Sequence, residues 1–321
     1  METITYSVIL PVYKNAESID RLLIALGEMN QALNKQMEAV FVVDGSPDES
    51  YALLKEKLVQ QSFDSQLLLH SRNFGSFPAI RSGLAVAKGN FFGVMAADLQ
   101  EPPTLLLEIF TSLQLNECDV GVGTRSSRED PLYSKIASQT FWKIYKRLVV
   151  KEMPEGGVDV FGCNTIFRNQ LLQLEESRSS LIALIFWLGF RRKLFSYQRL
   201  VRQEGGSSWT LNKKIDYMMD SIFAFTDYPI KLLLKIGFLG CVLSFVIGIM
   251  ILIAKFFGQI IVPGYAATML VVLFFGALNL FSLGLVGNYA WRAYENTKKR
   301  PLAIVSSHIH FQNLLKNFQS V

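Results

Sequence analysis

Apolar and polar positions follow two alternating patterns over the first 125 residues of the chain. Short runs of apolar and β-branched residues have the length of strands, and they occur at Ser7–Val12, Met37–Val43, Gln66–His70, Phe91–Ala96 and Asp119–Thr124. The longer stretches between them carry apolar residues at helical spacing, and they occur at Ala16–Glu28, Glu49–Gln60, Phe77–Lys88 and Thr104–Asn116. Strands that alternate with helices predict crossover connections, a mostly parallel sheet and therefore an α/β fold. In such a fold the ligand crevice lies at the carboxyl ends of the strands.

Two long apolar segments near the C-terminal end predict a pair of transmembrane helices. Leu232–Phe257 and Ala266–Trp291 are each long enough to cross a hydrocarbon core of about 30 Å at about 1.5 Å per residue. The segment between them, Gly258–Tyr265, is uncharged and contains a Pro-Gly pair, which indicates a tight turn. Lys255 lies near this turn, whereas the outer ends are flanked by Lys231, Lys235, Arg292, Lys298, Lys299 and Arg300. The positive-inside rule therefore places both outer flanks in the cytoplasm. Two buried core helices are the alternative interpretation.

Three shorter apolar or amphipathic stretches come before these segments, at Phe141–Val150, Leu181–Phe190 and Ile215–Phe225. They are too short to cross a bilayer, and such helices lie either in the membrane interface or against the sheet. For Ile215–Phe225, which adjoins the first long segment, we expect the interface. For Phe141–Val150 both interpretations remain open.

The chain is therefore expected to have four parts. An α/β domain at residues 1–208 is followed by a juxtamembrane amphipathic helix at 209–230. Two transmembrane helices, at about 232–257 and 266–291, occupy 231–292, and a cytoplasmic C-terminal tail occupies 293–321.

Charge and cysteine content narrow the class of partners. The net charge of +5 suits an anionic surface or a phosphate-bearing substrate, and no zinc-finger spacing or recognisable helix-turn-helix indicates nucleic acid. The three cysteines, Cys118, Cys163 and Cys241, are odd in number and far apart, which predicts a reducing setting without a disulfide framework. The apolar run Tyr6–Val12 is short and lacks the basic flank of a signal peptide, so we expect the first domain to stay where it is made.

Acidic side chains follow two of the expected strands. Asp44 comes at the end of Met37–Val43, where a carboxylate can accept hydrogen bonds from a nucleotide base or ribose, with a helix cap as the alternative. Asp98 and Gln100 follow Phe91–Ala96, just before a double proline. Their oxygens can hold Mg²⁺ or Mn²⁺ against a pyrophosphate, with an acidic helix start as the alternative.

Basic and polar residues follow a third strand, Gln66–His70. Arg72 and Asn73 sit where this strand ends, and Gly75 permits a close approach of the backbone. The group suits a phosphate or a nucleotide, and a surface turn is the alternative.

Two later groups suit the phosphate of a lipid. Arg125 and Arg128 come after the fifth strand, and arginine forks match phosphate oxygens bidentately. Arg202 and Ser207, before the first long apolar segment, form the second group. Solvated surface residues are the alternative for both groups.

Histidine catalysis is not expected. The three histidines, His70, His308 and His310, form no helical metal pair beside an acid and no Ser-His-Asp order. The chain also has neither a Walker loop nor a GxGxxG motif.

Seven features then combine along nearly the whole chain: VILPVY (Val8–Tyr13), VDGSPD (Val43–Asp48), SRNFG (Ser71–Gly75), ADLQEPP (Ala97–Pro103), the segment of Arg125 and Arg128, RQEGGSSW, and two long apolar segments ending in YENTKKRPLAIV. In this order and spacing they resemble the family 2 glycosyltransferases of the dolichol-phosphate mannose synthase type. The likeness is closest to the bacterial bactoprenol (undecaprenyl phosphate) glucosyltransferases.

The resemblance implies a fold, an activity and a location. The fold is a GT-A catalytic domain with interfacial helices and a two-helix transmembrane hairpin. The activity is inverting transfer of a hexose from a nucleotide-sugar such as UDP-glucose to undecaprenyl phosphate, with Mg²⁺ or Mn²⁺. The location is the bacterial inner membrane, with the catalytic domain and both termini cytoplasmic, and relatives commonly form homo-oligomers.

The resemblance also assigns residues by position. Asp98 and Gln100 look like the metal group, and Asp159 resembles an acidic position near the acceptor, where Arg125 and Arg128 join the catalytic group. The remaining assignments are to the nucleotide-sugar, and they are Pro11, Tyr13, Asp44, Arg72, Asn73, Gly75 and Ala97.

Three positions depart from the family pattern. Val43-Asp44 stands where an acidic pair is usual, Ala96 where an Asp is usual, and Lys14-Asn15 where an Asn-Glu pair is usual. A carboxylate missing at position 96 weakens metal binding, because hard divalent cations favour charged oxygen ligands. An alternative is therefore a catalytically weakened membrane scaffold that binds lipid phosphate or a partner glycosyltransferase.

Overall fold

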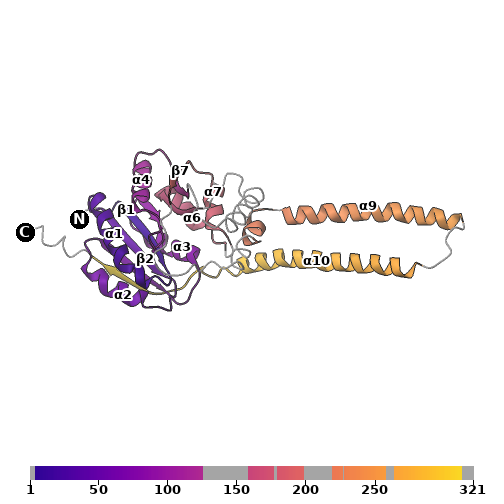
Figure 1. The fold of residues 1–321 in the computed structure, drawn as a ribbon, viewed down its shortest axis with the longest axis horizontal. Coiled ribbons are helices and arrows are strands. Elements are labelled where there is room, and N and C mark those ends of the chain that lie inside the picture. Colours follow the sequence, from indigo (N-terminus) through magenta and orange to yellow (C-terminus); the bar gives the residue numbers. More distant parts are fainter. Residues whose placement is uncertain are drawn as a thin grey trace, which may run out of the picture.

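One mixed sheet organises the α/β domain (Figure 1). The computed structural model describes residues 4–125, 158–176, 179–198, 219–226, 228–257 and 264–312. Within them the sheet has the strand order β7-β5-β6-β4-β1-β2-β3-β8. The strands are β1 (Tyr6–Val12), β2 (Met37–Val43), β3 (Asp64–His70), β4 (Phe91–Val94), β5 (Val120–Arg125), β6 (Val158–Asn164), β7 (Arg192–Tyr197) and β8 (Val305–Phe311).

Helices cover both faces of this sheet. One apolar core lies beneath α1 (Ile19–Ala32), α2 (Ser50–Lys57) and α4 (Pro103–Gln114). A second lies beneath α3 (Ser76–Val86), α6 (Thr165–Gln173) and α7 (Leu181–Trp187). Short 3-10 turns, η1 (Ala16–Ser18) and η2 (Leu58–Gln60), adjoin α1 and α2. The result is a three-layer α/β/α domain, which buries each amphipathic helix against the sheet.

The central part of the sheet confirms the predicted α/β class. β4, β1, β2 and β3 are neighbours in that order and all run parallel. Since β1 lies between β2 and β4, the strand order reverses here, and such a switch point is where open α/β sheets bind ligands. Pairing between β1 and β4 ends at Ile9 and Val94. Pro11, two residues further along β1, has no N–H to extend the ladder.

Three strands outside this central part were not predicted. β6 runs antiparallel between β4 and β5, and β7 runs parallel to β5 at one edge. β8 runs antiparallel to β3 at the other edge, with Val305 opposite His70 and Phe311 opposite Ser65. It lies within residues 293–321, for which the sequence indicated only a tail.

Two long helices extend from one end of the domain (Figure 1). They are α9 (Tyr228–Phe256) and α10 (Tyr265–Thr297), about 44 and 50 Å long at about 1.5 Å per residue. By length and composition, α9 is the one helix among the described residues that could cross a membrane, and α10 does not meet the same criterion. The predicted second span therefore stays a proposal.

A short helix at residues 219–225 connects α10 to the α/β domain. Arg292 Nη2 on α10 lies 2.6 Å from Asp220 Oδ1, and the Arg292 guanidinium stacks on Phe223 with its carbon 5.1 Å from the ring centroid. Tyr289 meets the same Phe223 ring edge to face at 5.2 Å, while Phe225 packs against the second core. This helix overlaps the stretch expected in the membrane interface, and that position stays a prediction.

The other two amphipathic stretches have different outcomes. α7 buries Ala183, Leu184, Ile185 and Phe186, so the stretch around it packs against the sheet and belongs to the second core. Phe141–Val150 lies outside the described residues.

Candidate functional site

Most of the sequence-predicted site residues lie at one end of the sheet. Asp44 follows β2, Arg72 follows β3, Asp98 follows β4 and Arg125 ends β5. β4 and β5 both run antiparallel to β6, so they point the same way, and Asp98 and Arg125 both lie at the carboxyl ends of these strands. The carboxyl ends of four strands thus bring together groups that are far apart in sequence.

Asp44 organises the loop after β3. Its Oδ1 accepts hydrogen bonds from His70 Nδ1 (2.8 Å) and from the Phe74 N–H (2.9 Å), and its Oδ2 accepts one from the Gly75 N–H (2.7 Å). The residue is only 3% exposed. Three donors satisfy most of the acceptor capacity of a buried carboxylate. The role that the structure shows for Asp44 is therefore to hold residues 71–75, and a direct contact with a nucleotide stays a prediction.

The loop after β2 presses closely against the loop after β3. Gly45 has φ +55°, and a Cβ built there would lie 2.3 Å from the carbonyl carbon of Arg72 and 2.5 Å from the Asn73 nitrogen. Only glycine has both the conformational freedom and the absence of a side chain that this contact requires. Beside it, the exposed Arg72 guanidinium stacks on Phe74, 4.1 Å from the ring centroid.

Asp48 joins the loop after β1 to the loop after β2. Its carboxylate accepts hydrogen bonds from Ser46 Oγ (2.6 Å), Ser50 Oγ (2.9 Å) and the Ala16 N–H (3.1 Å), while the Lys14 N–H donates to Ser46 Oγ (2.8 Å). Burial acts to raise the pKa of Asp48, but these hydrogen bonds outweigh it and hold the pKa below its ordinary value. The half-buried Pro11 and Tyr13 lie just before this junction, at the switch point.

The turn after β4 carries the candidate metal group. The carbonyl of the buried Ala97 accepts a hydrogen bond from Ser18 Oγ (3.0 Å), which fixes the turn against the start of α1. Asp98 is half-buried and its Oδ1 accepts the Gln100 N–H at 3.3 Å, whereas the Gln100 side chain is 8% exposed. Among the described residues no group of three or more His, Cys, Asp or Glu side chains gathers to hold a metal. One carboxylate still fits Mg²⁺, which commonly takes one or two carboxylates and completes its shell with substrate phosphates and water.

The candidate acceptor groups are only partly described. Asp159 is the second residue of β6, and since β6 runs antiparallel between β4 and β5, its backbone lies at the same edge as Asp98 and Arg125. Arg128, Arg202 and Ser207 lie outside the described residues.

The end of the sheet that holds the candidate site faces the long helices. α10 ends at Thr297, and eight residues later the chain enters β8 at Val305, opposite His70 at the carboxyl end of β3. The Ser71 N–H donates to the Ile304 carbonyl at 3.0 Å. The candidate site therefore lies at the end of the domain from which α9 and α10 extend (Figure 1).

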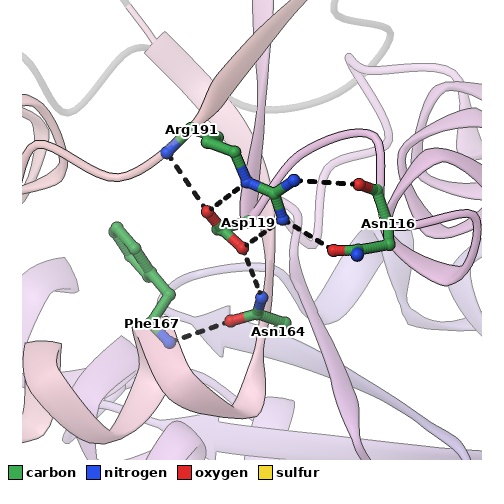
Figure 2. A network of polar contacts seen from close by, with 5 residues as sticks. All are labelled: Asn116, Asp119, Asn164, Phe167 and Arg191. Atoms are coloured by element: carbon green, nitrogen blue, oxygen red, sulfur yellow. Dashed lines mark hydrogen bonds and ion pairs between the residues drawn. The ribbon is translucent and has the colours of Figure 1, made fainter.

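A second polar network lies at the opposite end of the sheet (Figure 2). Arg191 donates to Asp119 from Nε (3.0 Å) and from Nη2 (2.9 Å), and Asn164 Nδ2 donates to Asp119 Oδ1 (3.0 Å). Asn164 Oδ1 in turn accepts the Phe167 N–H (2.9 Å) and caps α6. Hydrogen bonds from Arg191 hold the pKa of Asp119 below its ordinary value. The network joins the ends of β5, β6 and β7 and is structural.

Sequence reasoning missed the contact of His70 with Asp44 and the hydrogen bonds by which Asp48 joins two loops. His70 and Asp44 lie side by side because β2 and β3 are parallel neighbours with Val43 opposite Leu69, so the next residue of each strand meets its counterpart. That signal was present in the sequence, since both residues come at the ends of expected strands. A histidine that pairs with a carboxylate on a neighbouring strand follows neither a metal-binding nor a catalytic-triad pattern.

The family follows from a comparison of the sequence with known families. Residues 7–174, just over half of the chain, match the family model of glycosyl transferase family 2. The chain belongs to this family, and the α/β domain with its mostly parallel sheet is of the GT-A type.

Relatives match along nearly the whole chain. An uncharacterized glycosyltransferase of Synechocystis sp. is 30% identical over 95% of this chain and 95% of its own length. A prophage bactoprenol glucosyl transferase homolog of Escherichia coli is 25% identical, over 93% and 97% respectively. An undecaprenyl-phosphate 4-deoxy-4-formamido-L-arabinose transferase of Proteus mirabilis is 26% identical, over 97% and 96%. Among solved structures, a Pyrobaculum calidifontis mannosyltransferase in complex with GDP-Man and Mn²⁺ has a TM-score of 0.46 and 14% identity, over 63% of this chain and 58% of that one.

These matches make the protein an enzyme. It is a family 2 glycosyltransferase whose relatives include transferases named for bactoprenol and for undecaprenyl phosphate.

Proposed function

We propose that this glycosyltransferase moves a hexose from a UDP-linked sugar to undecaprenyl phosphate at the cytoplasmic surface of the bacterial inner membrane. The lipid acceptor is supported by the names of the relatives that match 93% and 97% of this chain. The same names differ in the sugar that is transferred. We expect a hexose such as glucose, and the transfer assay described below tests which nucleotide-sugar is the donor.

One structural observation carries the proposal. Asp98 and Arg125 lie at the end of the sheet where the parallel strands have their carboxyl ends. α10 is joined to this same end, because β8, the strand that follows it, begins with Val305 opposite His70. A prenyl chain stays in lipid while a nucleotide-sugar stays in water, so the reacting phosphate must meet the donor at the boundary between the two phases. A site at the helix-bearing end of the domain meets that requirement.

The membrane part of the proposal needs both long helices. α9 is apolar enough to span, and α10 is about 50 Å long at about 1.5 Å per residue and extends alongside it (Figure 1). Trp291 and Tyr294 are exposed near the domain end of α10, and Lys298 Nζ lies 4.3 Å from the Tyr294 ring centroid. Aromatic and basic residues together are typical of a helix end at the membrane interface. Lys299 and Arg300 extend the positive flank, which favours a cytoplasmic domain.

The reaction requires few groups beyond these. An ionised oxygen of the lipid phosphate attacks the anomeric carbon and forms the new C–O bond, while the bond from that carbon to the nucleoside diphosphate breaks with inversion. A phosphate monoester is mostly doubly ionised at neutral pH, since its second pKa is about 6, so it needs little help from a base. Asp159 is proposed to orient the acceptor, and Arg125, Arg128, Arg202 and Ser207 to bind its phosphate.

Binding of the donor falls to the loops at the switch point. Arg72, Asn73 and Gly75 are proposed to contact the nucleotide-sugar from the loop that Asp44 holds. Mg²⁺ or Mn²⁺, with Asp98 as its protein carboxylate and Gln100 beside it, would supply charge neutralisation at the pyrophosphate. Because Ala96 contributes no carboxylate, we expect this metal to bind weakly in the absence of the nucleotide.

The test is transfer of label into lipid. The full chain in membranes is incubated with each of a panel of radiolabelled nucleotide-sugars and undecaprenyl phosphate, and the organic extract is counted. One UDP-hexose should label the lipid, and Asp98→Asn should abolish labelling while the protein stays in the membrane fraction. Glu108→Gln, which removes one charge from an exposed position on α4, is the matched control and should transfer normally. Full transfer by Asp98→Asn would remove Asp98 from the reaction, and an unlabelled lipid with every sugar would overturn the function.

A further inference from the structure

His70 is a buried imidazole with polar partners on both ring nitrogens. It is the last residue of β3, and its side chain is fully shielded from solvent. Nδ1 lies 2.8 Å from Asp44 Oδ1, and Nε2 lies 3.0 Å from Ser82 Oγ on α3. No substrate can reach this ring, so His70 can act only through its neighbours.

The partners determine where the ring proton lies. A carboxylate is an acceptor only, so Nδ1 must carry a hydrogen and donate it to Asp44. Nε2 is then satisfied by the hydroxyl of Ser82, which can accept or donate. The imidazole thus links the buried carboxylate to α3, and an apolar residue in its place would leave both partners short of a hydrogen bond.

Two routes lead from His70 to the loop that carries Arg72. Through Asp44, the imidazole shares a carboxylate with the Phe74 and Gly75 N–H groups. Through its ring, it meets Phe74 edge to face at 5.7 Å, and Phe74 also stacks with the Arg72 guanidinium, 4.1 Å from the ring centroid. Both routes end on residues 72–75, which are otherwise an exposed loop.

We propose that His70 is a positioning residue for the nucleotide-sugar: it holds Asp44 and Phe74 so that residues 72–75 are ordered before the donor binds. The inference rests on the proposed function only in taking a nucleoside diphosphate sugar as the ligand of this loop. A loop ordered in advance costs less conformational entropy on binding, which raises affinity without changing the chemical step. His70 therefore affects KM and not kcat.

Three substitutions separate the contributions of the two nitrogens. Asn places an N–H near the position of Nδ1, Gln places one near Nε2, and Phe keeps the ring that packs on Phe74 but removes both hydrogen bonds. His70→Asn should keep KM for the nucleotide-sugar within about threefold of the native value. His70→Gln and His70→Phe should raise KM by about 10- to 100-fold, as expected for loss of a hydrogen bond to a charged group, with kcat nearly unchanged. His310→Gln, at an exposed position of β8, is the matched control.

A second measurement keeps the test independent of folding and of the lipid acceptor. Binding of the UDP-sugar is measured by calorimetry with the purified full chain and its variants, together with their thermal stability. The expected order of affinity is native, then His70→Asn, then His70→Gln and His70→Phe. Equal affinities in all four proteins would overturn the proposal, and so would losses of stability and kcat with KM unchanged, because these indicate a purely structural histidine. If the four proteins bind the UDP-sugar with this order of affinity but the native protein never labels a lipid, the proposed function fails and the inference on His70 stands.

Discussion

Replacing Gly45 by alanine tests whether donor binding depends on the spacing between the loop after β2 and the loop after β3. The new Cβ would lie 2.3 Å from the carbonyl carbon of Arg72, 2.5 Å from the Asn73 nitrogen and 2.7 Å from the Arg72 Cα. Carbon atoms pack at about 3.5–4.0 Å, so the loops must separate by about 1 Å or more. These neighbours are backbone atoms and cannot rotate away as the end of a side chain would.

Two effects of this substitution differ in size and in location. The first is local strain, because a residue with a Cβ at φ +55° costs about 1–2 kcal/mol relative to glycine. The second is displacement of Arg72 and Asn73, which takes the loop out of the arrangement proposed to bind the donor and so lowers the affinity for the nucleotide-sugar. We expect stability to fall by a few degrees in the thermal midpoint and the KM for the nucleotide-sugar to rise at least tenfold.

Two other glycines serve as controls in the same transfer and thermal-shift assays. Gly189→Ala, outside the loops proposed to bind the donor, also places a Cβ at positive φ, +72°, but this Cβ would meet nothing closer than the Trp187 carbonyl oxygen at 3.9 Å. Gly27→Ala in α1 has nothing within 4 Å and should stabilise the helix slightly. Strain alone should therefore affect the Gly45 and Gly189 variants to a similar extent, whereas displacement of Arg72 and Asn73 should affect only the Gly45 variant. A native KM in Gly45→Ala would refute the reasoning, since it would mean that the loop spacing does not determine donor binding.

Three further predictions concern other parts of the molecule. A chain that stops at Arg300 should remain in the membrane fraction but lose transfer to undecaprenyl phosphate, because β8 no longer holds β3; normal transfer would contradict this role. The lowered pKa of Asp48 adds stability that is present above about pH 4 and is lost as the pH falls through the lowered value. The thermal midpoint of the native protein should therefore fall more steeply between about pH 5 and 3 than that of Asp48→Asn, and parallel pH curves would contradict this prediction. In a Cys241→Ser background, N-ethylmaleimide should leave the folded protein unlabelled, because burial raises the thiol pKa of both Cys118 and Cys163; rapid labelling would show that one of them is accessible.

The sequence predicted the central strands well because of where they lie. β1 to β5 are covered on both faces. β1, β2 and β4 therefore read as nearly continuous apolar runs, β3 and β5 contain shorter apolar stretches, and the predicted ends of all five agree with the structure within about two residues. β7 and β8 are edge strands whose short sequences, RKLFSY and VSSHIHF, contain many polar residues and no clear alternation. β6 contains Gly162 and two polar residues, and its partners come from strands far away in sequence. Such pairings leave no local pattern to detect.

The site was predicted in outline but not in its internal contacts. Parallel strands have their carboxyl ends at the same end of a sheet, and this rule predicted that Asp44, Arg72 and Asp98 lie together. The structure shows all three at that end. The same rule could not show that Asp44 is used by His70 and by two backbone N–H groups, because burial and hydrogen bonding depend on how a loop folds back. A carboxylate that follows a strand therefore indicates the location of a site, whereas its partners decide whether it contacts the ligand or holds the loop that does.

β8 gives the connection between the long helices and the catalytic domain a physical meaning. If the α/β domain were attached to the long helices only by a linker, the distance between its site and a bilayer would not be fixed. Here the segment after α10 returns to the sheet and forms seven residues of strand against β3, and Tyr51 Oη donates to Ser307 Oγ at 3.1 Å. The first backbone hydrogen bond of this junction, from the Ser71 N–H to Ile304, belongs to the residue before Arg72. The segment that follows α10 is thus hydrogen-bonded to the start of the loop proposed to bind the donor, an arrangement that suits the proposed transfer between a water-soluble donor and a lipid acceptor.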